Sequence, residues 1–217
     1  MIKACIFDLD GTLADTIESL AYSVGRTLEE MGLSPITKGQ CQSFVGNGAK
    51  MLLDKALKAA GDKEALRLDE AMEVYGRIFD ENCTYHVTPY EGIEKLLEEL
   101  RRRGVRLAVL SNKPHRQTVK VAEGVFGCGI FDLTMGQREG TARKPSPEGI
   151  FLILGKLGIT KEECLYVGDS EVDIETGRNA GVKTLSAAWG FRTEKELKAA
   201  GASELIRRPE ELLRFFN

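Results

Sequence analysis

Four short apolar runs divide the chain, and they carry the first structural prediction. These runs cover residues 2–7, 105–110, 164–167 and 182–187, and a weaker run covers 130–135. Apolar runs of this length without polar alternation are typical of strands that are buried on both faces of a parallel sheet. We therefore expect a parallel sheet assembled from segments that lie far apart in the sequence.

Helical periodicity fills the segments between these runs. Two apolar sets recur at the i, i+3, i+4, i+7 spacing of one helix face: Ile93, Leu96, Leu97 and Leu100, then Ile150, Ile153, Leu154 and Leu157. Glycines at 104 and 158 are placed to end these helices, and Ser146-Pro147-Glu148 predicts an N-cap, a proline at the first helical position and a first-turn acid. The alternation predicts an α/β fold with a Rossmann-like, three-layer parallel-sheet core.

The stretch from 16 to 85 breaks this alternation. It contains no convincing strand, whereas 17–31, 51–59 and 66–83 each have helical spacing. A helical block after the first strand, followed by a return to α/β, indicates an inserted cap. We expect a core of residues 1–14 and 86–217 and a helical cap of residues 15–85.

Composition and charge narrow the class of protein. The 217 residues are 42% hydrophobic and 29% charged, with a net charge of -3 and interspersed signs, so we expect no nucleic-acid partner. The basic triplet at 101–103 falls at a predicted helix end. No segment is long and apolar enough to span a bilayer, and the five cysteines are scattered, which favours a cytoplasmic protein without membrane partners. The sequence contains no signal for oligomeric state.

Polar clusters terminate the predicted strands. Residues 8–13 follow the first strand, 111–114 follow the second, 168–173 follow the 164–167 strand, and Lys144 precedes the Ser146 cap. Because the carboxyl ends of parallel strands form one edge of the sheet, we expect these clusters to make a single ligand site.

These clusters resemble the four motifs of the haloacid dehalogenase superfamily of phosphatases. The matching residues are Asp8-x-Asp10-Gly11-Thr12, Ser111, Lys144 and Gly168-Asp169-x-x-x-Asp173, and the resemblance covers essentially the whole chain, cap included. It implies that Asp8 is the nucleophile and Asp10 the general acid and base.

The remaining site residues divide between metal and phosphate. The resemblance implies a Mg²⁺ ion held by Asp8, Asp169 and the backbone carbonyl of Asp10, with Asp173 orienting metal waters and Lys144; hard oxygen ligands suit this ion. The expected phosphate-binding residues are Thr12, Ser111, Asn112 and Lys144. The alternative for these acids is a set of helix N-caps. A cap is an open alternative for Asp173 alone, but the whole group of carboxylates would repel without a cation, which argues against caps for all of them.

The residue at position 10 separates branches of the superfamily. Dehalogenases and cation-pumping ATPases lack a carboxylate there, so Asp10 favours phosphate-ester hydrolysis or phosphomutase chemistry. The expected partner is a small phosphorylated metabolite.

Several segments resemble phosphoglycolate phosphatases in particular. They are 45–49, 89–92, 111–114, 144–147, 168–170 and 188–192. Gly46 and Asn47 are expected in a cap loop over the site, and Lys50 and Lys113 are the candidate cations for a carboxylated substrate, with a solvent-facing lysine as the alternative for each. One departure is Gly177, where relatives usually carry alanine.

Other functions share this pattern. Relatives with the same segments hydrolyse pyrophosphate, nucleotides or sugar phosphates, and a β-phosphoglucomutase-like enzyme would use the same nucleophile. A non-catalytic binding protein on this fold is the alternative from another class. The leading prediction is hydrolysis of a phosphate monoester, 2-phosphoglycolate, through an aspartyl-phosphate.

Overall fold

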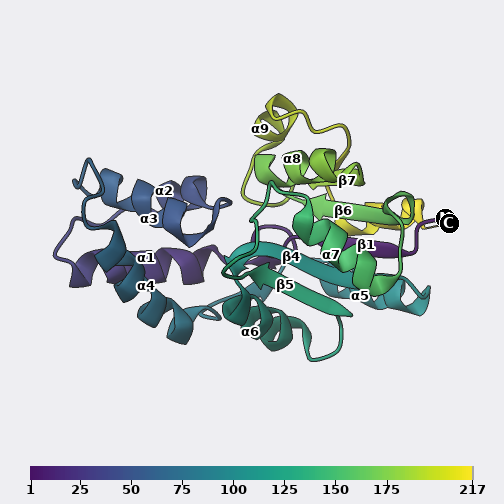
Figure 1. The fold of residues 1–217 in the computed structure, drawn as a ribbon, viewed down its shortest axis with the longest axis horizontal. Coiled ribbons are helices and arrows are strands. Elements are labelled where there is room, and N and C mark those ends of the chain that lie inside the picture. Colours follow the sequence, from purple (N-terminus) through teal and green to yellow (C-terminus); the bar gives the residue numbers. More distant parts are fainter. Residues whose placement is uncertain (217) are drawn as a thin grey trace.

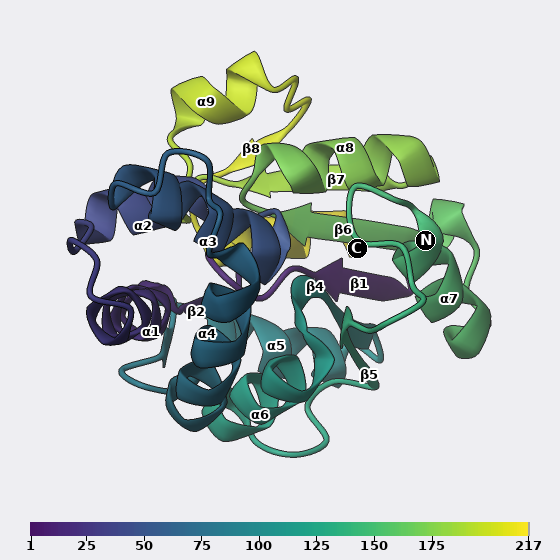
Figure 2. The same cartoon turned by 60° about the vertical axis from the view of Figure 1, so that its left-hand side comes forward.

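A six-stranded parallel sheet organises the computed structural model of the protein, which describes residues 1–216. In sheet order the strands are β5 (Leu133–Gln137), β4 (Arg106–Pro114), β1 (Ala4–Phe7), β6 (Cys164–Gly168), β7 (Lys183–Ala187) and β8 (Leu205–Ile206). Each predicted apolar run falls on a strand. Strand β8 was not predicted. Figure 2 shows the carboxyl ends of β1 and β6 directed toward the helices labelled α3 and α4.

Helices cover both faces of this sheet. Helices α5 (Ile93–Arg102) and α6 (His115–Phe126) pack with one set of alternating strand side chains, including Cys5 and Phe7 of β1. Helices α7 (Glu148–Leu157) and α8 (Glu171–Ala180) pack with the other set, which includes Ala4 and Ile6. The predicted three-layer α/β architecture is therefore confirmed, and β1 is buried on both faces, as its unbroken apolar run requires.

The helix ends follow the sequence signals closely. Helix α5 buries the predicted face of Ile93, Leu96, Leu97 and Leu100. Helix α7 ends at Gly158 in the left-handed conformation, as predicted. It begins at Glu148, one residue later than predicted, because Pro147 is the N-cap and the Ser146 hydroxyl accepts a hydrogen bond from the Glu148 N–H at 3.3 Å.

Four helices follow β1 and lie together beyond one end of the sheet, on the left in Figure 1. They are α1 (Ile17–Glu30), α2 (Lys38–Phe44), α3 (Gly48–Ala59) and α4 (Leu68–Asn82). Three of them match predicted helices. Helix α2 was missed because it buries only Cys41 and has no periodic apolar face. The boundaries of core and cap at 14/15 and 85/86 stay a prediction.

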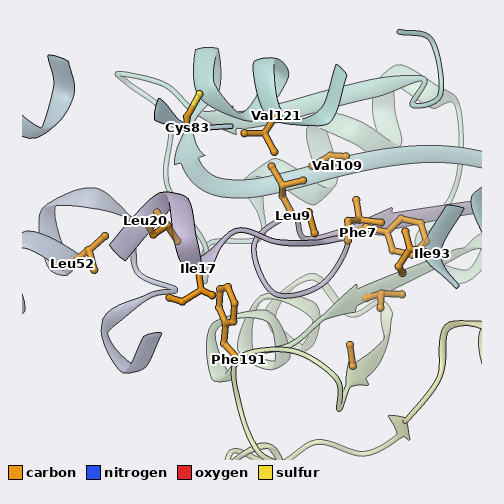
Figure 3. Close-up of a cluster of buried hydrophobic side chains, with 14 of the residues drawn as sticks. Phe7, Leu9, Ile17, Leu20, Leu52, Cys83, Ile93, Val109, Val121 and Phe191 are labelled. Carbon is orange, nitrogen blue, oxygen red and sulfur yellow. The ribbon is translucent and has the colours of Figure 1, made fainter. Parts of the chain in front are cut away.

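The two connections to this helical block are paired with each other. Strand β2 (Ala14–Asp15) runs antiparallel to β3 (Thr88–Pro89). One apolar cluster continues from the sheet into the block, and Figure 3 shows Phe7 and Val109 of the sheet in the same cluster as Leu20 and Leu52. The helical block is thus seated on the sheet edge where the polar clusters lie.

The rest of the chain completes the sheet edge and its connections. Helix α9 (Glu194–Ala199) precedes β8, and residues Lys161–Glu163 and Pro209–Phe215 form 3-10 helices. Within residues 1–216, no helix is both long enough and apolar enough to cross a membrane.

Candidate active site

The predicted polar clusters meet at the carboxyl edge of the sheet. Asp8 directly follows β1, Asp169 follows β6, and Asp173 lies in the first turn of α8. Carboxylate oxygens of these three buried residues lie within 4.8 Å of one another. Lys144 reaches the same point from the loop before α7, with its Nζ 2.9 Å from Asp8 Oδ1 and 2.7 Å from Asp173 Oδ1.

Burial and mutual repulsion set the charges of this cluster. Burial raises the pKa of Asp8 to about 7; Lys144 opposes the rise, whereas Asp173 and Asp10 add to it. Burial, followed by the charges of Asp173 and Asp8, also raises the pKa of Asp169 well above its ordinary value. Among the described ion pairs, the Lys144 ammonium contacts Asp8 and Asp173, and Asp169 has no cationic partner. The donor set of hard oxygens and the excess negative charge fit a divalent cation such as Mg²⁺.

Asp173 differs from the other two carboxylates because protein donors already occupy its oxygens. Its Oδ1 accepts hydrogen bonds from Lys144 Nζ and Tyr166 Oη, and its Oδ2 accepts from the N–H and hydroxyl of Ser170. Burial alone would raise the pKa of Asp173, but Lys144 and these hydrogen bonds hold it below its ordinary value. This arrangement suits the orienting role expected for Asp173 better than direct metal ligation.

Asp169 is fixed by one side-chain donor, one backbone donor and two closely approaching glycines. Its Oδ1 accepts a hydrogen bond from Thr12 Oγ1 at 3.0 Å, and its Oδ2 accepts from the Phe191 N–H at 2.7 Å. Gly11 has a φ of +85°, and a Cβ at Gly11 or Gly190 would overlap with the Asp169 side chain. These two glycines therefore let the backbone approach the carboxylate from both sides.

Two expected phosphate-binding residues make other contacts. The Thr12 side chain is buried and directed at Asp169. Asn112 accepts a hydrogen bond from the Lys144 N–H through Oδ1, and its Nδ2 donates to the carbonyls of Lys144 and Gly46. Phosphate binding by both stays a prediction. Ser111 and Asn112 line the cavity described next.

A cavity lies between this cluster and the helical block. The core lines it with Asp8, Asp10, Ser111, Asn112, Lys113 and Asp169, and the helical block lines it with Leu20, Val45, Gly46, Ala49, Leu52, Tyr75 and Phe79. Lys113 Nζ donates to Asp10 Oδ1 at 2.6 Å inside this cavity. Lys50 is exposed and is not among the lining residues.

Side chains of the core hold the 42–47 segment of the helical block over the cavity. Arg192 donates to the carbonyls of Gln42 and Val45, and Arg143 donates to the carbonyl of Asn47 at 3.1 Å. In return, Gln42 Nε2 donates to the Phe191 carbonyl. Gly46 thus lies at the cavity, as expected, whereas Asn47 contributes a carbonyl contact to the core.

Sequence reasoning missed several residues that support the site, notably Tyr166, Gly190 and Arg192. Tyr166 lies within an apolar strand, where nothing in its neighbours marks a polar role. Gly190 and Arg192 belong to the 188–192 segment, which the resemblance had singled out without a role. The 188–192 segment was therefore the sequence signal that could have identified Gly190 and Arg192 as residues of the site.

Comparison with known proteins agrees with this geometry. A family model described as haloacid dehalogenase-like hydrolase matches residues 5–187. A phosphoglycolate phosphatase of Aquifex aeolicus (strain VF5) is 37% identical over 88% of this chain and 86% of its own length. Another, from Pectobacterium atrosepticum, is 30% identical over 98% of this chain and 91% of its own length.

Solved structures extend the agreement to the whole fold. A crystal structure of a phosphoglycolate phosphatase candidate from Lactobacillus delbrueckii subsp. bulgaricus has a TM-score of 0.89 and 29% identity, covering 99% of this chain and 98% of its own. The family model covers the helical block and the sheet from residue 5 through β7, and it includes all four polar clusters. The chain therefore belongs to the haloacid dehalogenase-like hydrolases.

Proposed function

We propose that this enzyme hydrolyses a small phosphate monoester, with 2-phosphoglycolate as the leading substrate, through a phosphorylated Asp8. The observation that carries the proposal is the buried group of Asp8, Asp169, Asp173 and Lys144 beside Asp10 at the cavity. The relatives that are named phosphoglycolate phosphatases support the choice of ester.

Asp8 and Asp10 divide the chemistry between them. The Asp8 carboxylate attacks phosphorus, and the bond between phosphorus and the leaving oxygen breaks as the leaving alkoxide takes a proton from Asp10. Asp10 then accepts a proton from the water that attacks the aspartyl-phosphate, which restores the Asp8 carboxylate and releases phosphate. Both residues line the cavity, so an ester bound there reaches both carboxylates.

Asp8, Asp169 and the carbonyl of Asp10 are the residues proposed to hold Mg²⁺. When bound, the ion neutralises negative charge on the phosphoryl group. Lys144, held by Asp8 and Asp173, adds a positive charge on the protein side of the site. Ser111 lines the cavity, and its hydroxyl is the proposed donor to a phosphoryl oxygen.

The test is phosphate release from a panel of small esters together with pyrophosphate, measured in Mg²⁺ and in EDTA. A preference for 2-phosphoglycolate that is lost in EDTA supports both reaction and substrate. Equal, weak release from all esters would keep the chemistry and remove phosphoglycolate as the leading substrate. Activity only in the presence of glucose 1,6-bisphosphate would identify a phosphomutase instead.

Asp8→Asn removes the nucleophile and keeps the side-chain volume. We expect phosphate release to fall by at least about 1,000-fold, because an amide cannot form the covalent intermediate. Circular dichroism and thermal unfolding check that the variant is folded. A folded Asp8→Asn protein with near-normal turnover would contradict the mechanism.

A further inference from the structure

We propose that Lys113 selects the substrate by binding a carboxylate of the leaving group, attached one carbon away from the ester oxygen. The inference rests on the proposed function and names the substrate class of the same site. It assigns the selecting cation to Lys113 and not to Lys50.

Lys113 is a buried cation within the ligand cavity. Its side chain is 2% exposed, and it lines the cavity. Its Nζ lies 2.6 Å from Asp10 Oδ1 and 4.9 Å from the centroid of the Phe79 ring. An ammonium carries three N–H donors, and Asp10 accepts one of them. The remaining donors can therefore serve an anionic ligand without breaking the pair.

The contact with Asp10 fixes where such an anion lies. In the proposed mechanism, Asp10 protonates the leaving oxygen, so the ester oxygen lies against its carboxylate. Because Lys113 contacts that same carboxylate, an anion on Lys113 lies next to the ester oxygen as well. A carboxylate separated from the ester oxygen by one carbon meets this requirement, whereas an anion on a long spacer does not.

The far wall of the cavity disfavours larger polar leaving groups. Leu20, Leu52 and Phe79 of the helical block present apolar surface, and Tyr75 carries the one side-chain hydroxyl among the described helical-block residues of this lining, so the wall offers few partners for sugar hydroxyls. The other cation in the described lining, Arg192, already donates to the Val45 carbonyl at 2.7 Å and to Glu171 at 2.9 Å. A compact acid therefore fits this cavity better than a sugar bisphosphate.

The test measures ligand binding by isothermal titration calorimetry in Mg²⁺. It uses the Asp8→Asn protein, which is expected not to turn the ligands over. The ligands are 2-phosphoglycolate and 2-hydroxyethyl phosphate, which differ in having a carboxylate or a neutral hydroxymethyl group. We expect about 100-fold tighter binding of the acid, the loss typical of removing one partner of a buried charge pair. Adding Lys113→Met should reduce that ratio to near unity, whereas adding Lys50→Met should leave it unchanged.

The ratio separates recognition from a general structural effect. The Lys113→Met substitution leaves Asp10 without its partner, and this affects the binding of both ligands equally. The ratio of the two affinities therefore reports only the contact with the ligand carboxylate. Measurable binding of the neutral ester shows that the variant is folded, and Lys113→Gln replaces it if it is not. A preference that survives loss of Lys113, or that disappears with Lys50→Met, would overturn the assignment.

Turnover of the wild-type enzyme keeps the two proposals distinguishable. If the wild-type protein hydrolyses esters but the binding preference does not depend on Lys113, the function stands and the selecting role falls. If it hydrolyses none, yet the preference depends on Lys113, the phosphatase proposal falls and the recognition of a carboxylated phosphate stands.

Discussion

At the scale of single residues, the site depends on side chains that are absent as much as on those that are present. Gly11 and Gly190 leave room for the Asp169 carboxylate, and the Phe191 N–H donates to it from the same loop as Gly190. A methyl group at position 190 would overlap with both the Gly11 carbonyl and the Asp169 side chain. Position 190 therefore has no room for any side chain larger than that of glycine.

Gly190→Ala should damage activity by displacing Asp169. We expect kcat/KM for phosphate release to fall by about 100-fold, which is typical of a misplacement of about 1 Å in a catalytic group. Gly25→Ala is the matched control, since a Cβ at position 25 of α1 meets nothing within 4 Å. Equal activity of the two variants would show that the backbone at 190 can shift without moving Asp169.

Residue-level signals in the sequence predicted the residues that the structure brings together in the candidate site, but not the residues that contact them. Asp8, Asp169, Asp173 and Lys144 were predicted because each follows a strand or precedes a helix cap, where parallel strands gather their ligands. Tyr166 was not predicted. It lies within a fully buried apolar strand, and only the structure shows that its hydroxyl donates to Asp173 at 2.6 Å. The Trp189 indole N–H donates a hydrogen bond to the Thr12 carbonyl, although the two residues lie far apart in the sequence. A contact between such widely separated residues leaves no local sequence pattern.

At the scale of elements, burial explains which segments could be predicted. The central strands are buried on both faces, so their apolar runs were evident. Strand β8 has two residues and α2 has one buried residue, and both are too short to show a period. The pairing of β2 with β3 joins positions more than 70 residues apart, and only the fold brings them together.

The contact between α8 and β7 explains why glycine stands at position 177. A Cβ there would overlap with Oγ1 of Thr184 and would lie 2.9 Å from its Cβ. The resemblance predicts alanine at this position, and the neighbouring threonine accounts for the difference. Glycine at 177 and threonine at 184 are thus a matched pair at the helix–strand contact.

Gly177→Ala should destabilise the protein in spite of the higher helix propensity of alanine. We expect a loss of about 1–3 kcal/mol in the free energy of unfolding, the usual cost of overpacking, measured by urea denaturation. Thr184→Ala in the same chain should recover part of it, since the Oγ1 overlap disappears. Gly155→Ala in α7, with nothing within 4 Å, is the control and should not destabilise. A stabilised Gly177→Ala variant would contradict this packing argument.

At the scale of the whole molecule, the sheet and the helical block share both a core and a ligand cavity. The apolar cluster runs through both parts, and the hydrogen bonds of Arg143 and Arg192 hold the 42–47 segment at the cavity. The carboxylates at this edge are themselves buried, which strengthens the electrostatic interactions between them. The charge balance of the buried carboxylates is therefore a property of the folded molecule as a whole.

That balance predicts how a divalent cation affects the whole protein. Asp8, Asp169 and Asp173 are buried together, and Lys144 pairs with Asp8 and Asp173 only, so the folded state without a divalent cation retains repulsion between carboxylates. The unfolded chain does not hold these groups together, so under the proposed function we expect Mg²⁺ to bind the folded state selectively. At about 100 times its Kd the ion adds about 2.7 kcal/mol.

For a chain of 217 residues this stabilisation corresponds to a rise in Tm of about 5–10 °C, measured by calorimetry in Mg²⁺ against EDTA. Asp169→Asn removes one proposed ligand and one repulsive charge. Its Tm in EDTA should therefore equal or exceed that of the parent, while the rise with Mg²⁺ should largely vanish. If Asp169→Asn keeps the full Mg²⁺-dependent rise, the ion is bound elsewhere, and the carboxylate cluster must relieve its repulsion by protonation instead.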